Sequence, residues 1–189
     1  MDRSVAKKVA RQRSAQLAAV QLNQEGGLEG QLVGLVMCTI EENAAFDDLN
    51  TEEAAVESAH YLTRQLGVPA IIGPSGSGNT SAVFTAIRDT QTLVISPSAT
   101  SPTLTSLDPT NVSDDNPGLL WRTAPPDSFQ GLEIAKDALK RNVKSVAVVH
   151  QVDAYGEGLA NVFSTELAAG GGEVQLVPWE NDNQRTEAT

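Results

Sequence analysis

Hydroxyl side chains gather in three loops, each of which directly follows an apolar run of the sequence. The loops read GPSGSGNTS at 73–81, SPSATSPTLT at 96–105 and QVDAYGEGL at 151–159. Serine and threonine offer neutral hydrogen-bond donors, and none of the three loops contains a lysine or an arginine. Several negative charges would need cationic partners. The loops therefore suit a carboxylate or a small zwitterion better than a triphosphate.

The first loop matches the spacing of a nucleotide-binding loop except at one position. Gly73, Gly78 and Thr80 fit, but Asn79 stands where that motif needs lysine, the group that contacts the β- and γ-phosphates. A P-loop-like nucleotide-binding enzyme is therefore a remote alternative. Both kinds of loop would place an anion at a helix N-terminus. For any single serine, an ordinary role in a turn or a helix cap competes with ligand binding.

Composition limits the other functional classes. A formal charge of −11 and a pI near 4.5 argue against a nucleic-acid partner, because phosphate binding needs a basic face. The single cysteine, Cys38, allows no internal disulfide, and we expect it to be a small buried apolar residue. With only two histidines in addition, we predict neither a metal site nor a cofactor. No apolar run approaches the roughly 18 residues of a membrane span.

Apolar periodicity predicts helices that alternate with strands. Thr51 is a plausible N-cap, and Asp127 and Gln130 have the spacing of a capping box. Such alternation is typical of βαβ units, and hence of a parallel sheet that is covered on both faces. The expected helices are 4–24, 51–66, 79–88, 127–142 and 156–169, and the expected strands are 32–40, 69–72, 92–96, 119–124, 143–150 and 173–179.

The predicted fold class is α/β, with a break near Ala124. Residues 1–123 form a Rossmann-like lobe with a parallel sheet, and residues 124–189 form the start of a second α/β lobe. In open α/β sheets, ligands bind beyond the carboxyl ends of the strands, where helix N-termini present free N–H groups. The three hydroxyl-bearing loops all lie at such ends.

Five segments resemble the type I periplasmic-binding-protein fold, specifically the branched-chain amino-acid (leucine/isoleucine/valine) receptor family of ABC importers. They run in family order from about residue 15 to residue 178. This resemblance implies two lobes, joined by a hinge, that close on a ligand. The segments are NQEGGLEGQLVGLV, AIIGPSGSG, VISPSATSPTLT, LLWRTAPPDSFQG and VAVVHQVDAYGEGLANVFSTELAAGGGEV.

The resemblance also assigns the ligand contacts. Ser77 and the SPSAT turn, with the backbone at Ser98 and Ala99 and the hydroxyl and amide of Thr100, would hold the α-carboxylate. The Thr100 hydroxyl would also help to hold the ammonium group. Tyr155 would cover the ligand from the second lobe.

The function implied by the resemblance is that of a receptor and not of an enzyme. It would bind an amino acid or a similar small carboxylate in the periplasm or outside the cell, and would deliver it to an ABC permease. A ligand-sensing domain of a signalling protein with the same fold is the alternative, because fold alone does not fix function. No nucleic acid is expected as a partner.

The sequence departs from the family pattern at both ends. The usual first strand is missing, and the second lobe stops after its second strand, so the chain looks like a fragment. An incomplete sheet leaves backbone groups unpaired at its edge. A homodimer that supplies the gap, or a rearranged first helix, would cover such an edge.

Overall fold

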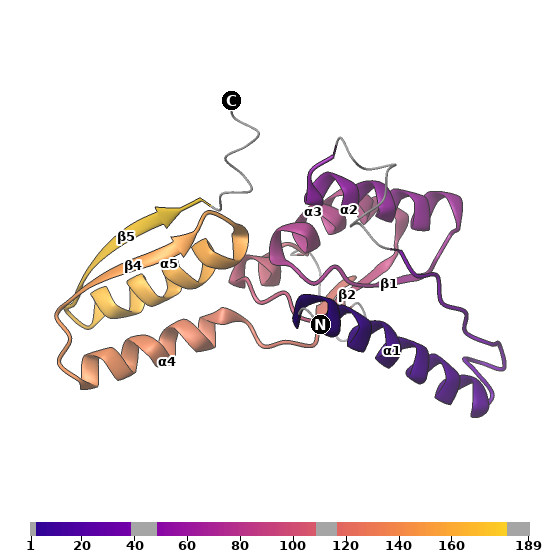
Figure 1. Ribbon diagram of the computed structural model, residues 1–189, viewed down its shortest axis with the longest axis horizontal. Helices are drawn as coiled ribbons and strands as arrows, with labels where there is room; N and C mark the ends of the chain where they lie inside the picture. The colour runs from indigo at the N-terminus through magenta and orange to yellow at the C-terminus, as the bar shows by residue number, and fades with distance from the viewer. Residues whose placement is uncertain (1–2, 39–48, 109–116, 181–189) are drawn as a thin grey trace. The chain divides into compact units, whose positions relative to one another are not determined.

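The computed structural model describes residues 3–38, 49–108 and 117–180, which fall into two compact units, 1–43 and 44–189. The first unit begins with helix α1 (Arg3–Gln24) (Figure 1). The helix ends before Gly26 and Gly27, whose positive φ angles of 106° and 77° carry the chain into a turn.

The sequence prediction of a buried strand is wrong for the segment after this turn. Residues 32–38 form no strand, Leu32 is 77% exposed and Cys38 is exposed, whereas a buried strand over 32–40 and a buried cysteine were expected. The Asn23 side chain bonds to both backbone groups of Val33, at 2.7 and 2.9 Å. No strand pairs with 32–38 among the described residues, so its apolar side chains have no sheet to support them. The last two residues of the predicted strand, 39 and 40, lie outside the described ranges.

The second unit contains a three-stranded parallel sheet. Its strands are β1 (Ala70–Ile72), β2 (Leu93–Ser96) and β3 (Leu120–Arg122), with β2 in the centre. Ile71 pairs with Val94, and Ile95 pairs with Trp121. Parallel register brings the carboxyl ends of all three strands to one edge of the sheet.

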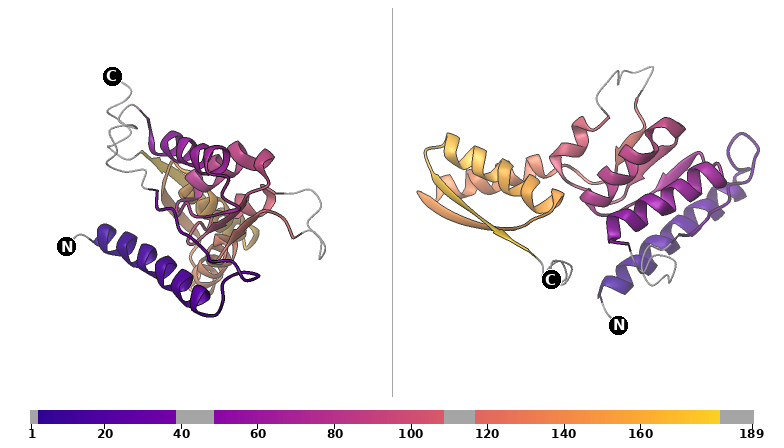
Figure 2. Two further views of the ribbon diagram at one scale, coloured as in Figure 1. Left: turned by 90° about the vertical axis from the view of Figure 1, so that its right-hand side faces the viewer. Right: turned by 90° about the horizontal axis from the view of Figure 1, so that it is seen from above.

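Two helices cover one face of this sheet (Figures 1 and 2). They are α2 (Thr51–His60), which continues as η2 (Tyr61–Gln65), and α3 (Ser77–Ile87), which continues as η3 (Arg88–Thr90). The two helices pack against each other. Their buried apolar residues and those of β2 form the core of this part, namely Ala54, Ala55, Ala59, Val83, Phe84, Ile87 and Val94.

The helix starts differ from the predicted caps by small shifts. Asn50, not Thr51, caps α2, and its side chain accepts from the N–H groups of Glu52 and Glu53, at 3.0 Å each. The Glu53 carboxylate in turn accepts the backbone N–H of Asn50, which completes a capping box. A short 3-10 helix, η4 (Pro102–Ser106), follows β2.

The second sheet has two parallel strands, β4 (Ser145–Gln151) and β5 (Glu173–Trp179). Helices α4 (Asp127–Lys140) and α5 (Ala154–Ala169) pack against each other, and α5 packs against both strands. A cluster of Ala135, Phe163 and Leu167 forms the core here, with Val146, Val148 and Val174 packed around it.

Only one face of this second sheet is covered within the described residues, whereas cover on both faces was predicted. Val149 on the opposite face is 68% exposed, and its partner Val177 in β5 is 36% exposed. Side chains alternate between the two faces of a strand, so Val146 and Val148 point to the core while Val149 points away from it. The α/β class with parallel sheets is confirmed.

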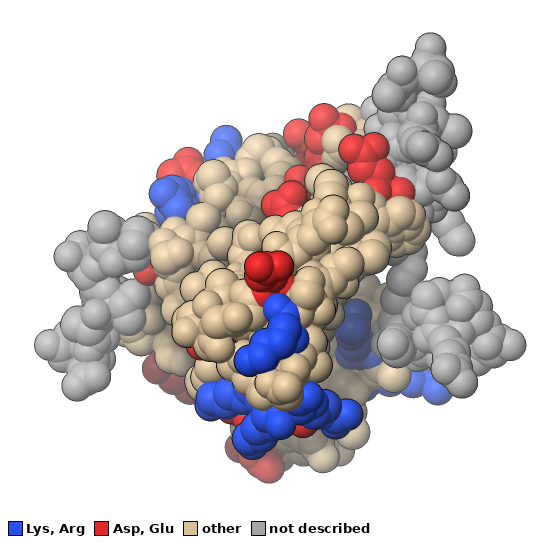
Figure 3. Space-filling model, turned by 90° about the vertical axis from the view of Figure 1, so that its left-hand side faces the viewer, with Lys and Arg blue, Asp and Glu red and all other residues tan. Residues whose placement is uncertain are grey.

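Basic side chains gather near the end of α4. Figure 3 shows this group on the side of the molecule formed by α4, α5, β4 and β5, and the basic residues of this stretch are Lys136, Lys140, Arg141 and Lys144. Lys136 lies 2.8 Å from Glu133, and Arg141 lies 2.8 Å from Asp137. The hydrogen bond from Lys136 lowers the pKa of Glu133. These are exposed pairs within one helix, which stabilise a protein only weakly.

In the part of the chain that the structure describes, no helix has the length and apolar character of a membrane span.

We predict that Thr80→Val destabilises the second unit by about 1 kcal/mol, the usual net value of a neutral hydrogen bond. Thr80 is fully buried, and its hydroxyl donates to the Gly76 carbonyl at 2.7 Å. Thr85 lies exposed on the same helix, so Thr85→Val should change stability by less than about 0.5 kcal/mol. Urea denaturation of both variants measures the difference, and equal losses would contradict this account of the loop.

Candidate functional site

Hydrogen bonds tie the first hydroxyl-bearing loop to the second. The Ser77 hydroxyl oxygen accepts the backbone N–H of Ser101 at 3.1 Å, and the Ser98 hydroxyl donates to the Ser75 carbonyl at 3.0 Å. Ser77 and Ser101 are both buried, at 4% and 0% exposure. Because Ser101 follows Thr100 directly, Ser77 and the Thr100 turn lie at the same edge of the sheet.

Ser96, the last residue of β2, shapes the second loop. Its hydroxyl oxygen accepts the N–H of Ala99 at 3.1 Å, and its proton goes to the Pro74 carbonyl at 2.6 Å. Ser96 is fully buried and Ala99 is 1% exposed. The turn at 96–99 is therefore held closed by one side chain, which also fixes its distance from the first loop.

Thr100 bonds to a residue that the sequence prediction assigned to another role. Its hydroxyl donates to Oδ2 of Asp127 at 2.7 Å, and the backbone N–H of Asp127 donates to the Thr100 carbonyl at 2.8 Å. Asp127 is 2% exposed. The predicted capping box is wrong here, because Pro126 is the N-cap of α4 and Asp127 is its first residue. The carboxylate turns away from its helix to a partner 27 residues earlier.

Arg122, at the end of β3, brings a cation beneath the second loop. Its guanidinium donates to the Ser101 carbonyl at 2.8 Å, and also to the Thr105 hydroxyl. Burial lowers the pKa of Arg122, and the nearby Asp127 charge acts in the opposite direction. The loops themselves carry no cation, but the neighbouring strand supplies one, which loop composition alone did not reveal.

The third loop starts α5 and approaches the second loop. Asp153 is the N-cap, and its carboxylate accepts the N–H of Gly156 at 2.6 Å. A Cβ at Gly158 would lie 2.9 Å from Oγ of Ser101, so glycine allows α5 to come this close. Tyr155 lies in the first turn of the helix, not ahead of it as predicted, and is 43% exposed.

The structure thus brings four of the five predicted residues into one network. Ser77, Ser98, Ala99 and Thr100 are linked through the loops after β1 and β2. Tyr155 stands on the helix that meets this network at Gly158. Their binding of a ligand remains a prediction.

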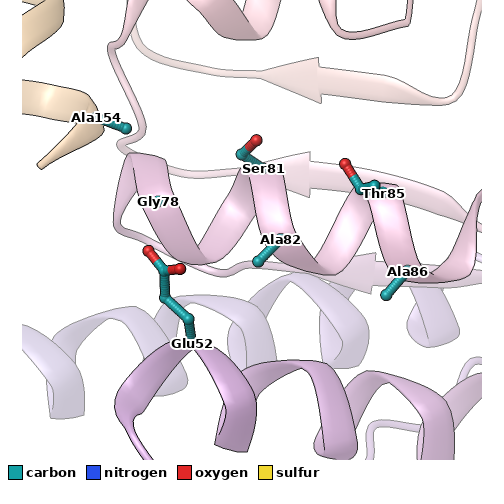
Figure 4. A pocket seen from close by; sticks show the side chains of 7 residues that line it. All are labelled: Glu52, Gly78, Ser81, Ala82, Thr85, Ala86 and Ala154. Carbon is teal, nitrogen blue, oxygen red and sulfur yellow. The ribbon is translucent and has the colours of Figure 1, made fainter.

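A hollow of about 450 Å³ lies on a different side of α3. In Figure 4 the Glu52 carboxylate of α2 points at the start of α3 beside Gly78. The other residues that line the hollow are Ser81, Ala82, Thr85, Ala86 and Ala154. A carboxylate in this position repels an anionic ligand. A carboxylate-bearing molecule is therefore not expected in this hollow. The described residues contain no cluster of three or more His, Cys, Asp or Glu able to hold a metal ion.

We predict that Ser77→Ala costs about 1–3 kcal/mol of unfolding free energy, because the buried N–H of Ser101 loses its acceptor. Ser81 on the same helix is partly exposed at the hollow, and Ser81→Ala should cost less than about 0.5 kcal/mol. Chemical denaturation compares the two variants. Faster amide exchange at Ser101 in the Ser77 variant alone is the local signature; unchanged exchange there would refute the link between the loops.

Comparison with known proteins gives one family and several relatives. A family model described as "Receptor family ligand binding region" matches residues 10–188. The Leu/Ile/Val-binding protein BraC3 of Rhizobium johnstonii is 33% identical over 158 residues, which cover 83% of this chain and 38% of that protein. The Leu/Ile/Val-binding protein of Escherichia coli K12 is 30% identical over 161 residues, covering 85% and 39%. The chain spans about two fifths of the length of these relatives.

Solved structures show the same fold. The leucine binding protein LivK of Thermotoga maritima aligns with a TM-score of 0.68 at 22% identity, over 89% of this chain and 45% of that one. LivJ of Streptococcus pneumoniae, a branched-chain amino acid transporter substrate binding protein solved with isoleucine, aligns with a TM-score of 0.65 at 24% identity, over 96% and 49%. The resemblance and the fold predicted from the sequence are confirmed.

Proposed function

This chain belongs to the receptor family ligand-binding region, and from that premise we propose that it binds an amino acid or a similar small carboxylate as an extracytoplasmic solute-binding receptor. The observation that carries the proposal is the network of Ser77, Ser98, Ala99 and Thr100 at one edge of the first sheet. Curated relatives are named for binding leucine, isoleucine and valine, which supports a branched-chain amino acid as the ligand.

The chemistry of the network supports binding without reaction. Ser77 sits in the first turn of α3, where backbone N–H groups attract an anion. Within the described ranges, its hydroxyl accepts from a backbone amide and contacts no histidine, so no described base activates it as a nucleophile. We therefore propose a receptor and not an enzyme, in which Tyr155 covers the ligand when the lobes close.

The lobes in this proposal are residues 1–123 and 124–189. The change of sheet between Arg122 and Ser145 supports the boundary, because β1–β3 and β4–β5 form separate sheets. The proposed location is the periplasm or the cell exterior, and the proposed partner is an ABC permease, by analogy with the relatives. A homodimer that covers the exposed apolar segment 32–38 belongs to the same proposal.

A sensor domain of a signalling protein is the second candidate. The same network would serve it equally well, because binding is common to both functions. Genes for a permease and an ATPase beside this one would favour transport, and a downstream kinase domain would favour sensing.

We predict that Thr100→Ala weakens binding of leucine tenfold to a hundredfold, because it removes a hydrogen bond to a charged group worth about 1.5–3 kcal/mol. Ser101→Ala should change affinity less than twofold, since the Ser101 hydroxyl faces that of Thr103 at 2.9 Å. NMR titration with leucine measures even weak binding by both variants.

Two results would count against the proposal. Equal weakening by the two variants would mean that the register of the second loop is misassigned. Absence of a response to any amino acid or small carboxylate, together with binding of ATP, would favour the nucleotide-binding alternative.

A further inference from the structure

We propose that the basic first half of α1 docks on the acidic start of α2 in a second copy of this chain, so that two copies form a closed dimer. The homodimer belongs to the proposed function, and this inference, which rests on it, names the surfaces that meet. It comes from the uneven distribution of charge along the chain, and from exposed apolar side chains beyond the charged residues of both helices.

Helix α1 concentrates positive charge in a chain that is otherwise acidic. Its first half contains Arg3, Lys7, Lys8, Arg11 and Arg13, which are five of the 13 basic residues of the chain. None of the 24 acidic residues lies in α1. The rest of the chain is therefore more acidic than the formal charge of −11 indicates. A helix of this charge is complementary to an acidic surface.

These positive charges stand where they destabilise the helix that carries them. The start of a helix is the positive end of its dipole and disfavours a cation, yet Arg3 is the first residue of α1 and the first turn contains no acidic residue. Arg3, Lys7 and Arg11 also follow one another at intervals of four residues, a spacing at which like charges repel on a helix. An acidic partner surface would offset both costs.

Helix α2 presents the opposite charge at its start. Glu52, Glu53 and Glu57 are all exposed. Within the described ranges, their one ion-pair contact joins Glu57 to His60, at 3.9 Å, so no described lysine or arginine neutralises them. Glu53 and Glu57 are four residues apart and repel each other in the same way as the basic residues of α1.

Exposed apolar side chains follow the charges in both helices. In the second half of α1, Leu17 is 58% exposed and Val20 is 52% exposed; Tyr61, where α2 continues as η2, is 53% exposed. Leu17 follows Lys7 by ten residues, and a similar interval of eight residues separates Tyr61 from Glu53. Two such helices that lie side by side and run in the same direction therefore match charge with charge and apolar surface with apolar surface. Burial of the apolar side chains favours the contact.

A second copy is the partner that carries the matching surface. In a two-fold dimer each copy supplies one α1 and one α2, so the same contact forms twice. An anionic membrane would also attract α1, but it would repel the acidic remainder of the chain. The bonds from Asn23 to Val33 hold the start of segment 32–38 at the end of α1. A copy that docks on α1 therefore lies next to the apolar segment that the proposed homodimer covers.

The test exchanges charge between the two helices. One variant combines Lys7→Glu with Arg11→Gln, and the other combines Glu57→Lys with Glu53→Gln, which keeps an acceptor for the capping box. We expect the dissociation constant of the dimer to rise at least about tenfold in each variant, because like charges then face each other. An equimolar mixture of the two variants should dimerise about as tightly as the unaltered chain, because both contacts of the mixed dimer join opposite charges. Sedimentation equilibrium measures all of these constants.

A matched control alters the other basic group of the protein. Lys136→Glu with Lys140→Gln changes the same amount of charge at the same spacing, on the exposed surface of α4. This control should leave the dissociation constant unchanged. High salt should weaken the dimer of the unaltered chain, because it screens charges at a surface. Thermal unfolding checks that every variant is folded.

The outcomes distinguish this inference from the proposed function. A chain that is monomeric at every salt concentration overturns the inference and the homodimer, whereas leucine titration of the same chain decides ligand binding separately. A dimer that the two charge variants do not weaken, or that their mixture does not restore, overturns the inference alone. A monomer whose α1 binds phosphatidylserine vesicles, or whose melting temperature falls in the α1 variant, assigns α1 to a membrane or to its own chain and also overturns it. Weakening by both charge variants, recovery in the mixture and no effect of the control support it.

Discussion

Two hydrogen bonds between Thr100 and Asp127 join the loop after β2 to the first residue of α4. The rest of the site depends on this junction, because it links the hydroxyl network of the first sheet to the helix that leads into the second sheet. A buried carboxylate is costly unless it is hydrogen-bonded. The buried carboxylate of Asp127 needs a hydrogen-bond donor, and this requirement fixes where the Thr100 turn lies. Arg122 beneath the loop offsets part of the negative charge of Asp127.

Around this junction the network is built almost wholly from neutral groups. Ser96 closes the turn, Ser77 accepts from Ser101, and Thr80 holds the loop before α3. Each such bond contributes about 1 kcal/mol or less net, yet an unpaired buried partner costs more. Many hydrogen bonds, each of which contributes little, thus hold the loops in place.

Much of this arrangement could be predicted from local sequence. Strand-loop-helix order and apolar runs located β1 to β5 to within two residues, and the hydroxyl-rich composition marked the loops. Asp127 was misassigned because capping-box spacing is a local signal, whereas its real partner lies 27 residues away. Arg122 was missed for the same reason. The segment 32–38 has the composition of a strand, but a strand also needs a paired neighbour, which composition cannot supply.

The central claim is that neutral hydroxyls and helix-end amides at the loops after β1 and β2 capture the carboxylate of a small molecule. Backbone amide shifts of the ¹⁵N-labelled chain during titration with leucine test it most directly. The account predicts that the largest shifts fall at Ser77 and at Ser98 to Thr100. Shifts confined to the residues around Glu52 at the hollow beside α3, or none at saturating leucine, would contradict it.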